Sequence, residues 1–131
     1  MSPRATAMLD KRHPRVLVVE DEPVLAFAIE DLLIEAGFDV VGVATRLETA
    51  LAIVKRDVFD AAILDANLAG VSAGPVASAL AARGLPFLVL SGYLPEQQDS
   101  AFSGALRLQK PCRPDRLILA LRSILPVGVM P

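Results

Sequence analysis

Short apolar runs alternate along the chain with longer segments that have helical spacing. The apolar runs are at 16–19, 40–43, 61–64, 87–90 and 105–108. The first four are almost continuously apolar, which is typical of parallel strands covered on both faces. The fifth has Arg107 between two leucines, which favours an edge strand. We therefore predict five parallel strands with the last one at an edge.

The segments between these runs carry apolar residues three and four positions apart. They are 25–36, 47–54, the alanine-rich 74–84, and 114–125, while the polar segment 94–104 has room for only a short helix. Pro23 and Pro114 suit first helical positions, Gly37 is a stop signal and Pro126 ends the last helix. The order βαβαβαβαβα predicts a doubly wound α/β domain, a (βα)5 fold.

Composition supports one domain. The chain has 131 residues, 53% of them hydrophobic, and a net charge of −2. Such a chain can bury a core, and it lacks the basic excess typical of nucleic-acid binding. We expect a domain at 15–125, with a polar tail at 1–14 and a short tail at 126–131.

Charge is unevenly distributed. Residues 20–65 include eleven acids and three bases, whereas residues beyond 100 include five bases and one acid. This asymmetry indicates an anionic or metal-centred site and a charged face for a partner. Solvated helix faces are the alternative interpretation.

Cys112 is the only cysteine. A single thiol excludes an internal disulfide and a multi-thiolate zinc site, and it favours the reducing cytoplasm. No apolar run approaches the roughly 18–20 residues of a membrane span, and the N-terminal residues lack the apolar centre of a signal peptide. We read Cys112 as a packing residue.

Polar side chains follow four of the five predicted strands. They are Glu20, Asp21 and Glu22 after the first, Asp65 and Asn67 after the third, Ser91 after the fourth, and Lys110 after the fifth. Ligands of open α/β sheets bind at the carboxyl ends of the strands. Carboxylate and amide oxygens suit Mg²⁺, and a lysine with a hydroxyl suits phosphoryl oxygens. Glu22 is interpreted as a solvated acid in the first helical turn.

At these positions the sequence resembles the CheY-like receiver domains of two-component response regulators. The residues that carry the resemblance are Glu20 and Asp21 in "VVEDEP", Asp65 in "LDANLAG", Ser91 in "LSGY" and Lys110 in "LQKP". Each motif is common by itself, but all of them occur in order at successive strand ends. The resemblance covers residues 15–125.

The resemblance implies a role for each residue. Asp65 would accept a phosphoryl group from a histidine kinase, Lys110 would pair with Asp65 and then with the phosphoryl oxygens, and Ser91 would hydrogen-bond the phosphoryl group. Glu20, Asp21, Asp65 and the backbone carbonyl of Asn67 would hold Mg²⁺. The chain would then catalyse only its own phosphorylation and dephosphorylation.

The chain departs from the family pattern in three places. Ala69 stands where a proline is usual, Arg107 stands where an aromatic residue is usual, and the segment between Ser91 and Lys110 is short. A guanidinium is not readily buried in an aromatic slot. We therefore expect phosphorylation to order residues 93–104 instead of rotating an aromatic side chain inward.

The fourth strand, in "LPFLVLSGY", is similar to the "PFxFATGY" motif of a subgroup of stand-alone receivers. That subgroup implies kinases of the HWE/HisKA2 kind. We expect no output domain after residue 125, no nucleic-acid or membrane partner, and signalling by protein contact through the basic 105–125 face. A phosphate sink that drains a kinase is the alternative role.

Two other classes of protein are alternatives to a receiver domain. A phosphatase of the haloacid dehalogenase type needs an acid two residues after its nucleophile, where this chain has Asn67. A flavodoxin-like nucleotide-binding module needs a loop rich in glycine or hydroxyls after the first strand, where this chain has three acids.

Overall fold

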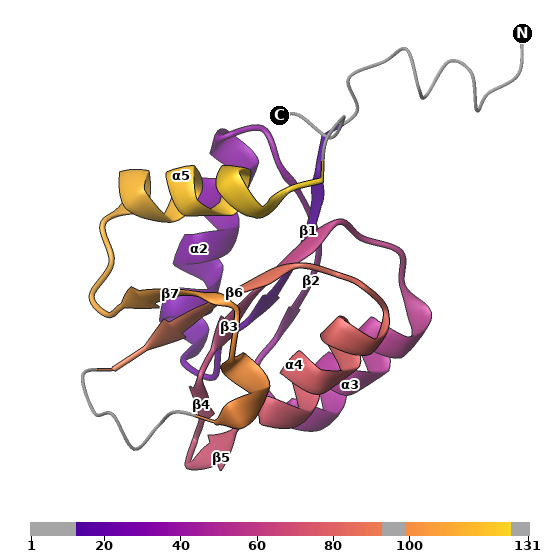
Figure 1. Ribbon diagram of the computed structural model, residues 1–131. Helices are drawn as coiled ribbons and strands as arrows, with labels where there is room; N and C mark the ends of the chain where they lie inside the picture. Colours follow the sequence, from indigo (N-terminus) through magenta and orange to yellow (C-terminus); the bar gives the residue numbers. More distant parts are fainter. Residues whose placement is uncertain (1–12, 93–98, 127–131) are drawn as a thin grey trace, which may run out of the picture.

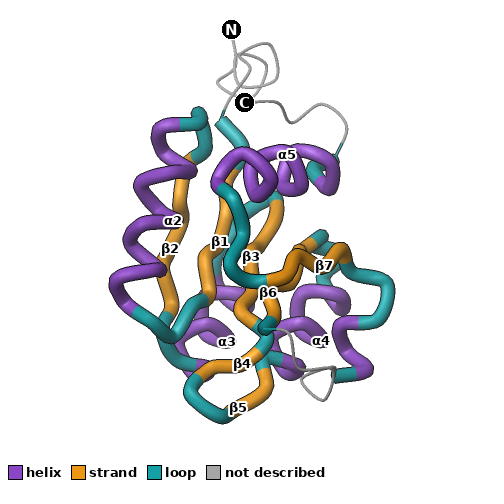
Figure 2. Tube along the Cα trace, turned by 90° about the vertical axis from the view of Figure 1, so that its left-hand side faces the viewer, coloured by secondary structure: helices purple, strands orange, loops and turns teal. Residues whose placement is uncertain are grey.

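The computed structural model describes residues 13–92 and 99–126. Five parallel strands form the central sheet in the order β2-β1-β3-β6-β7 (Figures 1 and 2). The strands are β1 (Arg15–Val19), β2 (Asp39–Ala44), β3 (Ala61–Asp65), β6 (Phe87–Ser91) and β7 (Leu106–Gln109). This sheet confirms the doubly wound α/β fold, and β7 is an edge strand as predicted.

Four helices cover the two faces of the sheet. They are α2 (Pro23–Glu35), α3 (Leu47–Arg56), α4 (Gly74–Ala82) and α5 (Pro114–Ile124). Figure 1 shows α2 and α5 on one face, and α3 and α4 on the other. Alternate residues of β1 enter two separate cores, Val16 and Val18 on the α2 side, Leu17 and Val19 on the α3 side. Burial on both faces explains why the strand sequences are continuously apolar.

None of the helices within the described parts of the chain is long and apolar enough to cross a membrane.

Glu22 is the N-cap of α2, one residue before the helix begins at Pro23. Its carboxylate accepts a hydrogen bond from the backbone N–H of Val24 at 3.2 Å. The prediction of an acid inside the first turn was therefore wrong by one position. A capping carboxylate satisfies one of the helix's unpaired N–H groups and also favours the positive end of the helix dipole.

A small antiparallel hairpin follows β3 and was not predicted. Its strands are β4 (Asn67–Leu68) and β5 (Val71–Ser72), joined by Ala69 and Gly70. Both joining residues have positive φ, 54° and 88°, as a two-residue turn of type I′ requires. Proline is fixed near −65° and cannot adopt this turn. The absence of proline at position 69 therefore agrees with the local backbone.

A single 3₁₀ turn, η2 (Ser100–Phe102), is the only helical structure among residues 99–104. The rest of the predicted short helix, through residue 98, lies outside the described residues. Phe102 is 1% exposed and packs in the core on the α3 and α4 side. The guanidinium carbon of Arg107 lies 5.5 Å from the centre of its ring. Arg107 thus stacks on a buried aromatic ring as a cation–π partner.

Candidate functional site

Three carboxylates meet where β1 and β3 end. These two strands are neighbours in the middle of the sheet, and Val19 pairs with Leu64 in their register. Glu20 and Asp65 therefore emerge side by side, with Asp21 next to them. One oxygen from each of the three carboxylates lies within 4.8 Å of the other two. The structure brings together the three acids that the strand-end pattern singled out.

Lys110 enters this cluster from the end of β7. Its Nζ lies 3.0 Å from Oδ2 of Asp65 and 3.2 Å from Oε1 of Glu20. Its backbone N–H donates to the carbonyl of Ser91 at 2.8 Å, and the Lys110–Pro111 peptide bond is cis. One ammonium faces three carboxylates, so the cluster keeps an excess of negative charge when all three are ionised.

Glu20 is the most deeply buried acid of the cluster, with 1% of its surface exposed. Oε2 accepts a hydrogen bond from the N–H of Glu22 at 3.2 Å. Oε1 is buried and accepts no hydrogen bond from the described residues, although the Lys110 ammonium attracts it. Burial, followed by repulsion from Asp65, raises the pKa of Glu20 to about 7. A buried carboxylate oxygen whose described partner is one ammonium that it shares with Asp65 is suited to receive a further cation.

Asp65 and Asp21 are shifted in opposite directions. Burial raises the pKa of Asp65. Hydrogen bonds from its neighbours lower the pKa but do not outweigh burial, and one of them comes from the N–H of Asn67, 3.2 Å from Oδ1. Burial also opposes ionisation of Asp21, but hydrogen bonding with Asp65, Glu20 and the N–H of Ala69 outweighs it and lowers the pKa. The Ala69 N–H donates to Oδ2 of Asp21 at 3.0 Å. Asp21 is therefore the acid of the cluster that ionises most readily.

The Asn67 side chain serves the hairpin. Its Oδ1 accepts a hydrogen bond from the N–H of Gly70 at 2.6 Å, which closes the turn. An amide in this position cannot protonate a leaving group, which argues against the phosphatase alternative. The role of the Asn67 backbone carbonyl as a metal ligand stays a prediction.

Ser91 ends β6 on the other side of Asp65. It is 8% exposed and follows Leu90, the residue that pairs with Asp65 in the β3–β6 register. Its hydroxyl is therefore carried on the adjacent strand, one residue beyond the carboxylate. The strand-end pattern found Glu20, Asp65, Ser91 and Lys110, but it missed the N–H groups of Asn67 and Ala69, because every residue type offers one.

The acidic cluster has the chemistry of a hard-cation site. It offers only oxygen donors, it carries excess negative charge, and Oε1 of Glu20 is buried with an ion pair to Lys110 but no hydrogen bond from the described residues. Mg²⁺ is bound in proteins by one or two carboxylates together with water. The residues present therefore fit a divalent cation of this kind.

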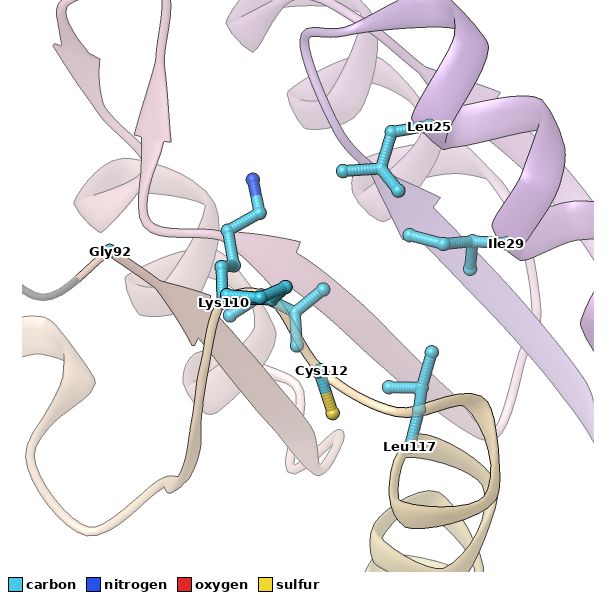
Figure 3. A pocket seen from close by; sticks show the side chains of 8 residues that line it. Leu25, Ile29, Gly92, Lys110, Cys112 and Leu117 are labelled. Atoms are coloured by element: carbon cyan, nitrogen blue, oxygen red, sulfur yellow. The ribbon is translucent and has the colours of Figure 1, made fainter.

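An apolar groove of about 380 Å³ lies next to the cluster (Figure 3). Leu25 and Ile29 point into it from α2, opposite Lys110, and Leu117 points into it from α5. Cys112 lines the same groove and packs partly against the core, and burial raises the pKa of its thiol. The raised pKa disfavours the reactive thiolate and agrees with a packing role.

Comparisons with known proteins agree with this geometry. Residues 16–122 match the model of the response regulator receiver domain. SdrG from Sphingomonas melonis Fr1 is 40% identical, with a TM-score of 0.74 over 86% of this chain and 97% of that one. The receiver domain of a modulated diguanylate cyclase from Desulfovibrio desulfuricans G20 is 28% identical, with a TM-score of 0.77 over 86% and 93%.

A curated relative is longer than this chain. The Bordetella pertussis protein BvgA, described as a positive transcription regulator of virulence factors, is 32% identical over 85 residues. The match covers 63% of this chain and 41% of BvgA, so the chain spans about two fifths of the length of that relative. The similarity therefore concerns only part of that relative. With its sheet order, its acidic cluster and the match over residues 16–122, the chain belongs to the receiver-domain family of response regulators in two-component signalling.

Proposed function

We propose that the chain accepts a phosphoryl group on Asp65 from a phosphohistidine of a histidine kinase, with Mg²⁺ bound by the acidic cluster. The observation that carries the proposal is the setting of Asp65. Its carboxylate is ion-paired with Lys110 at 3.0 Å and lies within 4.8 Å of two further acids. A nucleophile held between an ammonium and a cation site is suited to phosphoryl transfer, which depends on positioning and charge neutralisation.

Each side chain has a role in this reaction. An oxygen of Asp65 forms the bond to phosphorus as the phosphorus–nitrogen bond of the donor histidine breaks. The Asn67 N–H orients the Asp65 carboxylate, and Lys110 moves from that carboxylate to the phosphoryl oxygens. The Ser91 hydroxyl donates to a phosphoryl oxygen. Glu20, Asp21, Asp65 and the backbone carbonyl of Asn67 would hold Mg²⁺, which would supply positive charge near the phosphoryl oxygens.

Brief treatment with acetyl phosphate and Mg²⁺, followed by intact mass measurement, tests the proposal. We expect one phosphoryl adduct that is lost in Asp65→Asn and in the presence of EDTA. An adduct that persists in Asp65→Asn would contradict the assignment of the acceptor. Turnover of a generic phosphate ester would instead favour a phosphatase.

The surface next to the site suggests where a phosphohistidine protein binds. Asp65 is only 5% exposed, so the phosphohistidine protein must contact the residues that surround the site. Beside the site, α2 exposes Val24, Phe27 and Ile34, with 78%, 57% and 56% of their surfaces accessible. Apolar side chains this exposed are typical of a binding surface. We place the kinase contact on this stripe.

The downstream contact is proposed on the 105–125 face, as the basic residues there indicate. Leu119 is exposed on α5 and gives a matched test. Phe27→Asp should slow phosphotransfer from the kinase and leave acetyl phosphate labelling unchanged. Leu119→Asp should leave both reactions unchanged and weaken capture of a downstream protein. The reverse pattern would contradict the two assignments.

Two roles of the phosphorylated chain remain to be separated. A pull-down with and without phosphorylation distinguishes a signalling adaptor, which gains a partner, from a phosphate sink, which gains none. The fourth-strand sequence supports a stand-alone receiver that serves an HWE/HisKA2 kinase, and the single cysteine supports a cytoplasmic location. The proposed ordering of residues 93–104 falls partly outside the described residues. Amide exchange with and without beryllofluoride would test it, and unchanged exchange there would refute it.

A further inference from the structure

The β4–β5 hairpin lies between the acidic cluster and the η2 turn. It extends from the end of β3, directly after Asp65, and leads into α4 (Figure 1). It has only two residue pairs, Asn67 with Ser72 and Leu68 with Val71. A hairpin this short is at best marginally stable by itself. Its position is therefore set by contacts with the rest of the domain: Leu68 is buried in the core on the α3 and α4 side, and polar contacts lie at the two ends of the hairpin.

The tip of the hairpin holds a residue of the acidic cluster. The Ala69 N–H donates to Oδ2 of Asp21 at 3.0 Å. This contact depends on the positive φ of Ala69 and on the turn that the Asn67 side chain closes. The orientation of the Asp21 carboxylate is thus coupled to the position of the hairpin.

The base of the hairpin is tied to a residue that is distant in sequence. The Ser72 hydroxyl donates to Oδ2 of Asp99 at 2.8 Å and accepts from the Gly74 N–H at 2.9 Å. The other oxygen of Asp99 accepts from the Ala101 N–H at 2.9 Å and caps η2. Asp99 therefore links the hairpin to the η2 turn.

Gly74 provides the space for this link. A Cβ atom at position 74 would lie 2.2 Å from Oδ2 of Asp99. Any larger residue would displace the Asp99 carboxylate. The Asp99 carboxylate is therefore held by the Ser72 hydroxyl and fits only because glycine at position 74 has no Cβ atom.

We propose that the β4–β5 hairpin positions Asp21 for the divalent cation, and that the tie between Ser72 and Asp99 holds the hairpin in place. The inference rests on the proposed binding of Mg²⁺ by the acidic cluster. Without the tie the hairpin moves away from Asp21 part of the time, and cation binding must then restore the contact. The apparent affinity for Mg²⁺ is then the affinity of the intact state multiplied by the fraction of molecules in which the contact is intact. Ser72 and Asp99 are positioning residues outside the cluster.

Calorimetric titration of the full chain with Mg²⁺, without phosphodonor, tests the inference. We expect Ser72→Ala to weaken Mg²⁺ binding about five- to tenfold, at the lower end of typical couplings between two sites. Ser103→Ala, which removes an exposed hydroxyl beyond η2, is the matched control and should bind Mg²⁺ like the wild type. Equal affinities of the Ser72→Ala variant and the wild type would overturn the inference.

A double-mutant cycle between Gly74→Ala and Asp99→Ala adds a sharper test. Each change alone breaks the tie and should weaken Mg²⁺ binding to a similar extent. In the Asp99→Ala background, Gly74→Ala has no carboxylate to displace and should cause little further loss. Independent, multiplying losses would overturn the inference.

Hydrogen exchange separates positioning from a general effect on stability. Coupling between sites is reciprocal, so saturating Mg²⁺ should slow exchange of the Ala69 and Ala101 N–H groups in the wild type. In Ser72→Ala, Mg²⁺ should no longer slow exchange at Ala101. Retained slowing there would count against the tie. If the wild type binds no Mg²⁺ at all, the proposed function fails. If the wild type binds Mg²⁺ and the variants bind it equally well, this inference alone fails.

Discussion

Replacing Glu20 by Gln should stabilise the metal-free protein at neutral and higher pH. Burial raises the pKa of Glu20 from its ordinary value of 4.5 to about 7. The folded state therefore holds the Glu20 proton more tightly than the unfolded state. Below about pH 4.5 both states are protonated and no penalty exists. The penalty grows as the pH rises from 4.5 to 7 and is complete above that range.

The size of this effect follows from the pKa. One pH unit corresponds to about 1.4 kcal/mol, so a pKa of about 7 in place of 4.5 amounts to roughly 3 kcal/mol. Glutamine removes the charge. Its NH2 group, however, must face a donor, because the two oxygens of Glu20 face the Lys110 ammonium and the Glu22 N–H. We therefore expect a gain of about 1–3 kcal/mol at pH 8, or at least about 3–5 °C in melting temperature for a chain of this size.

The assay is urea unfolding in EDTA at pH 5, 6, 7 and 8 for the wild type and Glu20→Gln. The difference in free energy of unfolding reports Glu20 together with its coupling to Asp65 and Lys110, because groups that titrate alike in both proteins cancel. It should grow from pH 5 to pH 7 and level off toward pH 8. Saturating Mg²⁺ should then reverse the order of stability, because only the wild type keeps the full set of cation ligands. A difference that does not change with pH would refute the reasoning.

Three further predictions concern neighbouring residues. Asp21→Ala should abolish Mg²⁺-dependent phosphorylation by acetyl phosphate, whereas Glu22→Ala should leave labelling intact and cost about 1 kcal/mol in urea unfolding through loss of the α2 cap; equal loss of labelling would mean that the wrong acid was assigned to the metal. Ala69→Gly should raise the free energy of unfolding by about 1 kcal/mol, since glycine adopts a φ of 54° without strain; an unchanged or lower value would contradict strain at Ala69. Phe102→Ala should cost about 3–5 kcal/mol, measured in the same way, because the ring is buried in the core; a loss below 1 kcal/mol would show that η2 is not firmly packed.

The sheet and the site edge were predictable because both depend on simple rules. Strands buried on two faces read as continuous apolar runs, and each predicted run lies within one residue of an observed strand. Parallel strands then place Glu20, Asp65 and Lys110 at one edge, whatever the details of the loops. Their positions directly after the strands are therefore enough to predict that these three side chains converge.

The hairpin could not be predicted for an equally physical reason. Its turn places Ala69 in a conformation that normally marks glycine or asparagine, so only Gly70 carries the usual signal. The contrast between Glu20 and Asp21 was hidden as well, because adjacent acids look alike in a sequence. Only the fold shows that Glu20 continues the buried strand while Asp21 turns toward the hairpin. The link from Ser72 to Asp99 joins residues 27 apart and has no local pattern.

The edge position of β7 also has a consequence for how the protein behaves at high concentration. The strand pairs with β6 on one side only, and no described residue adds a strand on its other side. An open edge that carries Leu106 and Leu108 is a template for pairing between molecules. Arg107, which is half-buried at the centre of this edge, places a charge there while its guanidinium stacks on Phe102. We therefore expect the residue that replaces the usual aromatic of the family also to disfavour aggregation through the sheet edge.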